Sequence, residues 1–499
     1  MPRTARIVSL SLSLAPTEAP LRHRVADGVI ELLRTGQLHP GDALPATRAL
    51  AAQLGISRNA VLAAYDELAA AGFVHATGGS ATVVSAGADA AALAGVSSNS
   101  SSGSSLASGP LRGAAFPRRQ RPAPQSRRHR GPLAREEGAR EEVRWDLRTG
   151  YPDASLIASA DWRAAWRAAA RQPVTNGLPS APAQRELREA LAVHLRRTRG
   201  VVADPADIVL VPGVSSALRA LAAAAGLAGR PVAFEEPGYP EGRRALASAG
   251  AVIRPVPVDQ DGLDPAGLTR GDAAVYTTPA HQYPLGARLS AARRAALIGW
   301  ASREGALVIE DDYDGEFRYD VRGLPALHSM TGGPDVVAYV GTASKVLSPG
   351  LRVAWIIPPP YLRAAVRAAL DQSEETISAV TGHALAHFIG AGYLSRHLAR
   401  AARTYAARRH ALMAGLHDAG LPVSGVDAGL HLIAWLPPGT DEAGLRERLA
   451  GAGLAVDTLG DFALRPVYPD KALVCGYALL PESQAAAAAA VIAANVRGG

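Results

Sequence analysis

The stretch GTASKVLSPGLR, residues 341–352, follows a short β-branched run and contains one of the two lysines of the chain. Among 52 basic residues, only Lys345 and Lys471 are lysines, and all others are arginines. A guanidinium is too basic to act as a nucleophile at neutral pH, whereas a lysine amine can lose its proton and attack an aldehyde. Hydroxyl side chains flank Lys345 and Arg352 follows it, and such groups can hold a phosphate. The stretch therefore predicts a reactive amine beside a phosphate site, with a lysine in a surface loop as the alternative.

Short β-branched runs alternate with Ala-, Leu- and Arg-rich helical stretches from about Trp145 onward. The expected strands include residues 207–211, 231–234, 274–276, 306–309 and 336–340. This alternation is typical of a mostly parallel sheet that helices cover on both faces. Ligands of such sheets bind at the carboxyl ends of the strands, where polar clusters follow several of these runs.

Two of these polar clusters contain groups that can bind a ligand together with the lysine stretch. PGVSSA, residues 212–217, opens a helix whose free N–H groups and hydroxyls suit a phosphate, although an ordinary capped helix has the same pattern. EDDYDGEFRY, residues 310–319, fits a hard-metal site, a solvated loop or a carboxylate for a ring cation. An amine, a phosphate site and a partner carboxylate together are what pyridoxal 5′-phosphate (PLP) requires.

The first 85 residues have the pattern of a helix-turn-helix followed by a two-stranded wing. A helix is expected over residues 21–33, Thr47 and Ser57 can each cap a further helix, and Gly55 separates these two. The wing strands are expected at residues 73–75 and 82–84. The helix after Ser57 would enter the major groove of DNA. Candidate DNA contacts are Arg48, to phosphate, and Ser57, Arg58 and Asn59, near the base edges.

The chain has 499 residues, 48% of them hydrophobic and 19% charged, which is a globular composition too long for one ordinary domain. The net charge of +7 is concentrated in residues 86–144, where 10 arginines oppose 5 acids in a Ser-, Gly- and Pro-rich segment. We expect this segment to be a flexible linker between a domain of residues 1–85 and a domain of residues 145–499. The alternative is a linker that also holds DNA phosphates.

The cysteine content and the apolar runs indicate the cellular compartment in which the protein is expected. Cys475 is the one cysteine, so an internal disulfide and a CxxC metal site are excluded, and we expect no bound metal. No uncharged apolar run reaches the roughly 18 residues of a membrane span. The Ser/Leu alternation at residues 9–14 fits a short strand better than a secretory signal. We therefore expect a cytoplasmic protein, associated with the nucleoid when it is bound to DNA.

Two family resemblances cover nearly all of the chain except the linker. The stretch LHPGDALPATRALAAQLGISRNAVLAAYDELAAAGFV, residues 38–74, resembles the winged helix-turn-helix of the GntR family of bacterial transcription regulators, and the resemblance extends over about residues 18–85. The sequence departs from that family at Asn59, where threonine is common, and at Ala81, where glycine is usual. EEPGYP, TPAHQYPLGARLSAARRAALIGWA, IEDDYDGEFRY and GTASKVLSPGLRVAW are similar to stretches of the MocR family, in which such a wing precedes a class I aminotransferase-like domain. The resemblance implies an α+β winged helix-turn-helix followed by an α/β PLP-dependent transferase domain of fold type I, with a mostly parallel sheet and a smaller C-terminal subdomain.

The resemblance also implies roles for individual residues. Lys345 would form the Schiff base with PLP, Asp311 would pair with the pyridine nitrogen, and Tyr313 would bond the phenolic oxygen. The remaining cofactor contacts would be Tyr239 on the ring face, Tyr283 in place of the usual asparagine, and Ser215, Ser216, Thr342, Ser344 and Arg352 around the phosphate.

Recognition of an effector carboxylate departs from the aminotransferase pattern. Val474 stands where aminotransferases usually have the arginine that binds the substrate carboxylate. Arg465, in the preceding loop, and the more remote Arg243 are the candidates to replace it.

These features predict a PLP-dependent, DNA-binding transcription regulator that senses PLP itself or an amine or amino-acid effector. The expected partners are double-stranded operator DNA, that effector and a second copy of the chain in a head-to-tail homodimer. One alternative is an active class I aminotransferase with a fused DNA-binding domain, although the missing arginine disfavours turnover of α-amino acids. A cofactor-free DNA-binding protein is the other alternative.

Overall fold

The computed structural model describes residues 12, 21–70, 73–77, 81–84, 88, 143–173, 176, 184–319, 325–425, 428–464 and 470–497. The strand expected at residues 9–14 and the linker expected at residues 86–144 lie almost entirely outside the described residues.

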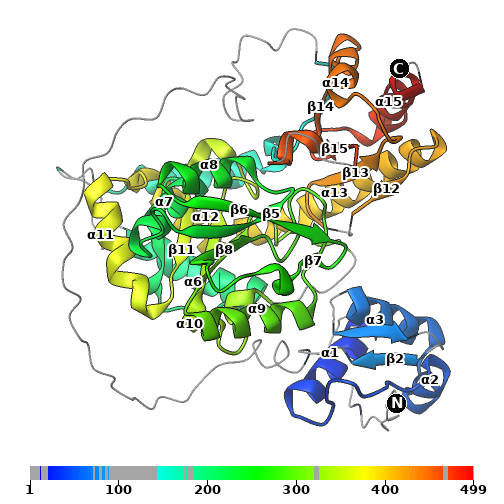
Figure 1. The fold of residues 1–499 in the computed structure, drawn as a ribbon, viewed down its shortest axis with the longest axis horizontal. Coiled ribbons are helices and arrows are strands. Elements are labelled where there is room, and N and C mark those ends of the chain that lie inside the picture. Colours follow the sequence, from blue (N-terminus) through cyan, green and yellow to red (C-terminus); the bar gives the residue numbers. More distant parts are fainter. Residues whose placement is uncertain are drawn as a thin grey trace.

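The N-terminal part forms the expected winged helix-turn-helix. Its elements are α1 (Leu21–Arg34), α2 (Thr47–Leu54), α3 (Arg58–Ala70) and the antiparallel strands β1 (Val74–Thr77) and β2 (Ala81–Val84). Val25, Leu50 and Val61, one from each helix, are fully buried and hold the three helices together. Figure 1 shows this domain below α9 (Ala291–Glu304) and β7 (Gly262–Leu263) of the larger domain.

Of the three predicted helix-end residues, the structure confirms Gly55 and Ser57 and corrects Thr47. Gly55 ends α2 in the left-handed conformation at φ 65°, and the Ser57 hydroxyl caps α3 by accepting from the Ala60 N–H at 3.2 Å. Thr47 does not cap α2, because the helix already includes it and Ala46 holds the cap position. The Thr47 hydroxyl instead accepts from Arg58 Nε at 3.4 Å.

The larger domain is built on an eight-stranded sheet in the order β4-β11-β10-β9-β8-β5-β6-β7. The strands are β4 (Val209–Val211), β5 (Pro231–Glu236), β6 (Val252–Asp259), β7 (Gly262–Leu263), β8 (Ala274–Thr277), β9 (Leu307–Asp312), β10 (Val337–Thr342) and β11 (Ala354–Ile357). Strands β10, β9, β8, β5 and β6 run parallel, which confirms the expected sheet type. The first expected strand is shorter than predicted, because Pro205–Asp207 forms a 3-10 turn before β4.

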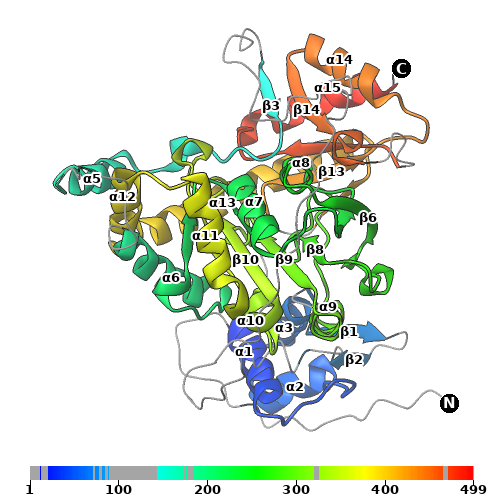
Figure 2. The ribbon, with the colours of Figure 1, turned by 60° about the vertical axis from the view of Figure 1, so that its left-hand side comes forward.

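Apolar residues alternate between the two faces of this sheet and pack against different helices. Phe234 and Ile309 face α7 (Val214–Ala224), α8 (Pro240–Ser248) and α11 (Arg363–Ser373). Ala233 and Val308 face α9 (Ala291–Glu304) and α10 (Gly333–Val336) on the other side. Figure 2 shows the two helical layers with the sheet between them. Because both faces are buried, the strands read as continuous apolar runs in the sequence.

The smaller subdomain contains a five-stranded sheet in the order β12-β13-β15-β14-β3. Its strands are β3 (Trp145–Leu147), β12 (Val423–Ser424), β13 (His431–Trp435), β14 (Leu454–Thr458) and β15 (Ala472–Gly476). Helices α13 (Tyr393–Asp418), α14 (Glu442–Gly451) and α15 (Ala485–Arg497) lie against it, and α5 (Ser159–Ala169), α6 (Arg185–Arg199) and α12 (Ala379–Gly390) form a separate layer. β3 pairs parallel with β14, so the start of the larger domain is part of the C-terminal sheet (Figure 2).

A buried ion pair fixes the end of β9 to α6. The guanidinium of Arg199 donates to both oxygens of Asp312, with 3.1 Å between Nη2 and Oδ1, and Tyr339 donates to Oδ2 at 2.8 Å. Position 315 has to be glycine, because a Cβ there would lie 2.2 Å from Asp312 Oδ1. Asp312, which follows Asp311 in β9, is therefore held in place by Arg199, Tyr339 and the close approach of Gly315.

Breaking this pair should destabilise the large domain strongly. Asp312→Asn leaves the Arg199 charge buried without a counter-charge, which should lower the free energy of unfolding by about 3–5 kcal/mol. All six tryptophans lie after residue 144, so urea unfolding followed by tryptophan fluorescence reports on this part of the chain.

Asp259→Asn is the matched control, because Asp259 is 55% exposed and pairs with Arg293 at the surface. That variant should lose no more than about 1 kcal/mol. Equal losses for the two variants would contradict the structural role assigned to the Asp312 pair.

Candidate functional site

A cavity at the carboxyl edge of the large sheet gathers most of the residues expected to hold the cofactor. Nine of them line it: Ser215, Tyr239, Tyr283, Asp311, Tyr313, Thr342, Ser344, Lys345 and Arg352. The lining also contains Gly213, Val214 and Pro349 from the two stretches expected to hold a phosphate, together with Tyr276 and Thr278, which sequence reasoning missed. Parallel strands that end at one edge explain the convergence of segments more than a hundred residues apart.

Lys345 is held by a backbone carbonyl that no sequence signal indicated. Its Nζ donates to the carbonyl oxygen of Gly150 at 2.8 Å, and a Cβ on Gly150 would lie 2.6 Å from Nζ. Burial lowers the pKa of Lys345, which favours the neutral, nucleophilic amine. Four carboxylates oppose this shift: Glu241, Asp311, Asp314 and Asp457.

Asp311 is buried with one oxygen occupied and the other without a partner among the described residues. Tyr276 donates to Oδ2 at 2.6 Å, whereas Oδ1 has no hydrogen-bond partner there. Burial raises the pKa of Asp311 to about 7. Tyr276 is itself fixed by stacking on Phe234, with ring centroids 4.3 Å apart. The carboxylate is thus oriented from one side and open to a donor on the other.

The acidic cluster of residues 310–319 divides its carboxylates among separate partners. Glu310 accepts from the backbone N–H groups of residues 327 and 328, at 2.7 and 2.8 Å. Asp312 binds Arg199 and Asp314 binds His281. The described part of the chain contains no group of three or more His, Cys, Asp or Glu side chains that could hold a metal ion. Of the three interpretations of this cluster, a carboxylate for a ring cation agrees best with the geometry.

Tyr313 belongs to a buried hydrogen-bonded chain. Its hydroxyl lies 2.9 Å from His281 Nδ1, and the same nitrogen lies 2.9 Å from Asp314 Oδ2. The ring of His431 lies 5.0 Å from that of His281, and His431 Nε2 donates to the Pro284 carbonyl at 2.7 Å. Burial lowers the pKa of His431 to about 3, so this ring is neutral at physiological pH.

The opposite end of the cavity has the features of an anion site. Arg352 adopts the left-handed conformation at φ 53°, and its guanidinium would lie 3.1 Å from a Cβ at Gly213. Gly213 precedes α7, so the N-terminus of that helix and Ser215 face the same space. Ser216 does not line the cavity, because its hydroxyl donates to Glu375 instead.

Arg243, the more remote of the two arginines suggested for an effector carboxylate, does not line the cavity. Arg243 donates to the Phe462 carbonyl at 3.2 Å and lies 3.7 Å from Glu236. Arg465 lies outside the described residues. Val474 is fully buried in β15, in an apolar cluster that includes Tyr283.

An acid that sequence reasoning did not single out, Asp457, is hydrogen-bonded to Thr149, which contacts Tyr283 of the cavity wall. Asp457 Oδ2 accepts from the N–H and from the hydroxyl of Thr149, each at 2.8 Å. The Thr149 hydroxyl also lies 2.7 Å from the hydroxyl of Tyr283. Thr149 and Asp457 are 308 positions apart, and only the pairing of β3 with β14 brings them together.

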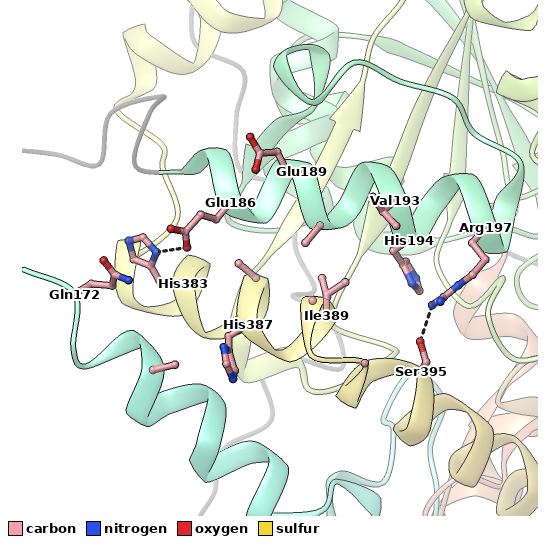
Figure 3. Close-up of a pocket in the computed structure, with 15 residues that line it drawn as sticks. Gln172, Glu186, Glu189, Val193, His194, Arg197, His383, His387, Ile389 and Ser395 are labelled. Carbon is pink, nitrogen blue, oxygen red and sulfur yellow. Dashed lines mark hydrogen bonds and ion pairs between the residues drawn. The ribbon is translucent and has the colours of Figure 1, made fainter. Parts of the chain in front are cut away.

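A larger cavity, of about 580 Å³, lies away from these residues between α5, α6 and α12 (Figure 3). Its polar side chains pair across the walls: His383 Nδ1 lies 3.1 Å from Glu186, and Arg197 donates to Ser395 at 2.6 Å. The candidate cofactor residues do not line it.

The expected DNA contacts are all exposed on the winged domain. Arg48 lies on α2, and Ser57, Arg58 and Asn59 lie at the start of α3. Among the described residues, no helix is both long and apolar enough to cross a membrane.

Comparison with known families agrees with both halves of the structure. Residues 147–469 match the family "Aminotransferase class I and II", and residues 21–84 match "Bacterial regulatory proteins, gntR family". The chain is similar to the HTH-type pyridoxine biosynthesis transcriptional regulator PdxR of Corynebacterium glutamicum, with 33% identity over 86% of each chain. It is also similar to the "Probable rhizopine catabolism regulatory protein MocR" of Rhizobium meliloti, with 31% identity over 92% of this chain and 90% of that protein.

Solved structures support the fold of the larger domain. An archaeal alanine:glyoxylate aminotransferase superposes with a TM-score of 0.66 at 24% identity, over 72% of this chain and 92% of that chain. The fold is therefore that of the aminotransferases of fold type I, which implies dependence on PLP. With a GntR-type winged domain joined to an aminotransferase-like domain, the chain belongs to the MocR family of transcriptional regulators.

Proposed function

We propose that the cavity around Lys345 binds PLP, and that its occupancy by PLP or by an amine effector controls DNA binding by the winged domain. The observation that carries the proposal is that the amine of Lys345 lines the same cavity as the buried carboxylate of Asp311, whose Oδ1 has no partner among the described residues. The anion site at Arg352 lies in the same cavity. Amine, carboxylate and anion site fit the aldehyde, ring nitrogen and phosphate of PLP.

Each group has a specific task in this proposal. Lys345 would hold the cofactor covalently, and Asp311 Oδ1 would accept a hydrogen bond from the ring N–H and keep that nitrogen protonated. Tyr313 would bond the phenolic oxygen, with its hydroxyl positioned by His281. Bound PLP supplies an aldehyde that condenses with amines and a ring that can accept electrons.

The walls of the cavity would orient the ring and the phosphate. Tyr239 would lie on the ring face, where aromatic contact adds about 1 kcal/mol beyond burial. Tyr283, which meets Tyr239 edge to face at 5.9 Å, would limit the ring on the effector side. Phosphate contacts would come from Ser215, Thr342, Ser344 and Arg352.

Regulation requires that the effector binds two arrangements of the protein with different affinity. We propose that these arrangements differ in the placement of two winged domains in a head-to-tail homodimer, each tethered by the segment of residues 86–144. Arg58 and Asn59 would read base edges, and Arg48 would bind phosphate. The protein would act in the cytoplasm, on the DNA of the nucleoid.

Residual aminotransferase activity is the second candidate function. The lowered pKa of Lys345 suits proton transfer as well as covalent binding. Steady-state transfer of amino groups to a keto acid would favour the enzyme, whereas effector-dependent shifts of operator DNA mobility favour the regulator.

The first prediction concerns the two lysines. Full-length protein mixed with PLP should develop the near-visible absorbance of a lysine-bound cofactor, and Lys345→Ala should abolish it. Lys471→Ala is the matched control, because Lys471 is the other lysine and pairs with Glu442 at 3.7 Å. After borohydride reduction, the pyridoxyl adduct should be found on Lys345 by mass spectrometry. A coloured Lys345→Ala protein would refute the assignment.

The second prediction concerns the pH dependence of the apoprotein. Because the pKa of Asp311 is raised to about 7, its contribution to stability is present at low pH and is lost as the pH rises toward 7. Asp311→Asn removes this loss, so between pH 5 and pH 8 the variant should gain on the order of 2 kcal/mol relative to the unsubstituted protein. Urea unfolding at both pH values measures the difference. Asp371→Asn, at an exposed position, should show no such gain in stability between the two pH values. An effect of Asp311→Asn that does not change with pH would contradict the assignment of Asp311 as a buried carboxylate with a raised pKa.

The third prediction separates base contacts from phosphate contacts. Arg58→Ala should weaken operator binding by about 1–3 kcal/mol and reduce the preference for operator over random DNA. Arg48→Ala should weaken both DNAs alike and reduce the slope of log affinity against log salt by about 1. Arg270→Ala, whose side chain is 93% exposed on the larger domain, should change neither. Equal effects of the Arg58 and Arg48 substitutions on operator and random DNA would refute the division of roles.

A further inference from the structure

A buried histidine and a buried carboxylate lie next to Tyr313, outside the cavity that Tyr313 lines. His281 and Asp314 are only 2% and 1% exposed, and neither belongs to the cavity lining. His281 lies in the segment after β8 and Asp314 lies two residues after β9, so the pairing of these two strands brings them together. A Cβ on Gly429 would lie 2.7 Å from Asp314 Oδ2, so the segment before β13 encloses the pair closely.

The surroundings of His281 decide which nitrogen of its ring carries a proton. Nδ1 lies 2.9 Å from Asp314 Oδ2 and 2.9 Å from the hydroxyl oxygen of Tyr313, whereas Nε2 has no hydrogen-bond partner among the described residues. A carboxylate accepts hydrogen bonds and does not donate them, so the proton between Asp314 and His281 belongs to Nδ1. This assignment is the same for the neutral and for the charged ring.

A protonated Nδ1 determines how Tyr313 uses its hydroxyl group. A ring nitrogen that carries a proton is a donor, so the Tyr313 oxygen accepts from Nδ1 and cannot donate to it. Burial, and after it the charge of Asp314, raises the pKa of Tyr313, so the hydroxyl keeps its own proton. That proton needs an acceptor other than His281.

Asp314 competes for the Tyr313 proton. Besides its charge, this carboxylate acts on the pKa of Tyr313 through a hydrogen bond. Because His281 donates to Oδ2, the ring satisfies part of the hydrogen-bonding capacity of Asp314 and weakens its attraction for the tyrosine proton. Without this donor, Asp314 would draw the Tyr313 proton toward itself and away from the cavity.

Other titratable groups surround this pair without hydrogen-bonding to it. Those that face it from the neighbouring elements are Asp311 of β9, Tyr283 after β8, Lys345 after β10 and His431 of β13. His431 donates to the Pro284 carbonyl and is neutral, since burial lowers its pKa to about 3. The hydroxyl of Tyr283 lies 2.7 Å from that of Thr149. Among the described residues, the hydrogen bonds of His281 therefore go to Tyr313 and Asp314 alone.

We propose that His281, held by Asp314, is a positioning residue that directs the Tyr313 hydroxyl proton into the cavity, so that Tyr313 donates to the phenolic oxygen of bound PLP. The inference rests on the proposed function, because that oxygen is present only when the cofactor is bound. A donor to the phenolic oxygen stabilises its negative charge and makes the neighbouring Schiff-base nitrogen less basic. The pair of His281 and Asp314 thereby keeps the pKa of the Schiff base low.

The pKa of the Schiff base on Lys345 tests the proposal, because the absorbance of the bound cofactor changes when this nitrogen loses its proton. Full-length, PLP-loaded protein is titrated from about pH 5 to about pH 9. His281→Leu removes the donor to Asp314 and should raise the Schiff-base pKa by about one pH unit, a roughly 10-fold change in proton affinity.

Two control variants separate the hydrogen bond from the loss of a buried ring. His281→Asn has a side chain similar in size to leucine but offers an amide N–H near the position of Nδ1, so it should keep most of the original pKa. His328→Leu replaces another buried histidine, which does not line the cavity, and should leave the Schiff-base pKa unchanged.

Tyr313→Phe shows whether His281 acts through the tyrosine. This variant lacks the donor itself, so it should raise the Schiff-base pKa at least as much as His281→Leu does. Adding His281→Leu to Tyr313→Phe should then cause no further rise, because the two residues act in series. Should His281→Leu not fold, as judged by tryptophan fluorescence, His281→Met makes the same prediction with a more flexible apolar side chain.

The outcomes distinguish this inference from the function on which it rests. An unchanged pKa in His281→Leu, an equal rise in His281→Asn, or a further rise in the Tyr313→Phe background overturns the inference and leaves the PLP site intact. Absence of any cofactor absorbance in the unsubstituted protein refutes the proposed function, and the inference with it.

Discussion

The amine of Lys345 and the carboxylate of Asp311 line one cavity without pairing directly. The residues around them have to stabilise both groups away from water. Withdrawing such groups from water costs several kcal/mol unless other interactions offset it. Tyr276 holds one oxygen of Asp311, and the Gly150 carbonyl holds the amine of Lys345. Neither contact neutralises the charge, so both groups remain suited to a ligand that brings an aldehyde and a protonated ring. Burial also explains the pKa shifts of the two groups, upward for Asp311 and downward for Lys345, because it disfavours the charged form of each.

The pleat of β9 separates carboxylates that would otherwise repel one another or gather a metal ion. Glu310 and Asp312 project from one face of the strand and Asp311 projects from the other. On their face, Glu310 caps backbone N–H groups and Asp312 binds Arg199. Asp311 is therefore the member of this run that faces the cavity. A run that reads in the sequence as a cluster of equivalent acids has one member that lines the cavity and two that bind other groups of the protein.

The small sheet positions the residues that lie near Lys345 and Tyr283. Because β3 pairs with β14, residues just after the linker supply the carbonyl for Lys345 and the donors for Asp457. The same sheet sets Asp457 opposite Val474. The surroundings of Lys345 thus combine residues at the edge of the large sheet with Gly150, which follows β3 of the small sheet.

The sequence by itself determined the two fold classes, and it singled out Lys345, Asp311 and most of the other residues that line the cavity. These signals are local, since helix caps, buried strand runs and a lone lysine among arginines each lie within about a dozen residues. It also placed Ser215 and Ser216 together at the phosphate, but helix geometry turns Ser216 toward Glu375. Only the tertiary structure decided that Tyr276 orients Asp311, that Gly150 holds Lys345, and that Thr149 binds Asp457. These contacts join strands and turns far apart in the chain, and strand pairing, which sets such neighbours, leaves no mark in either partner's local sequence.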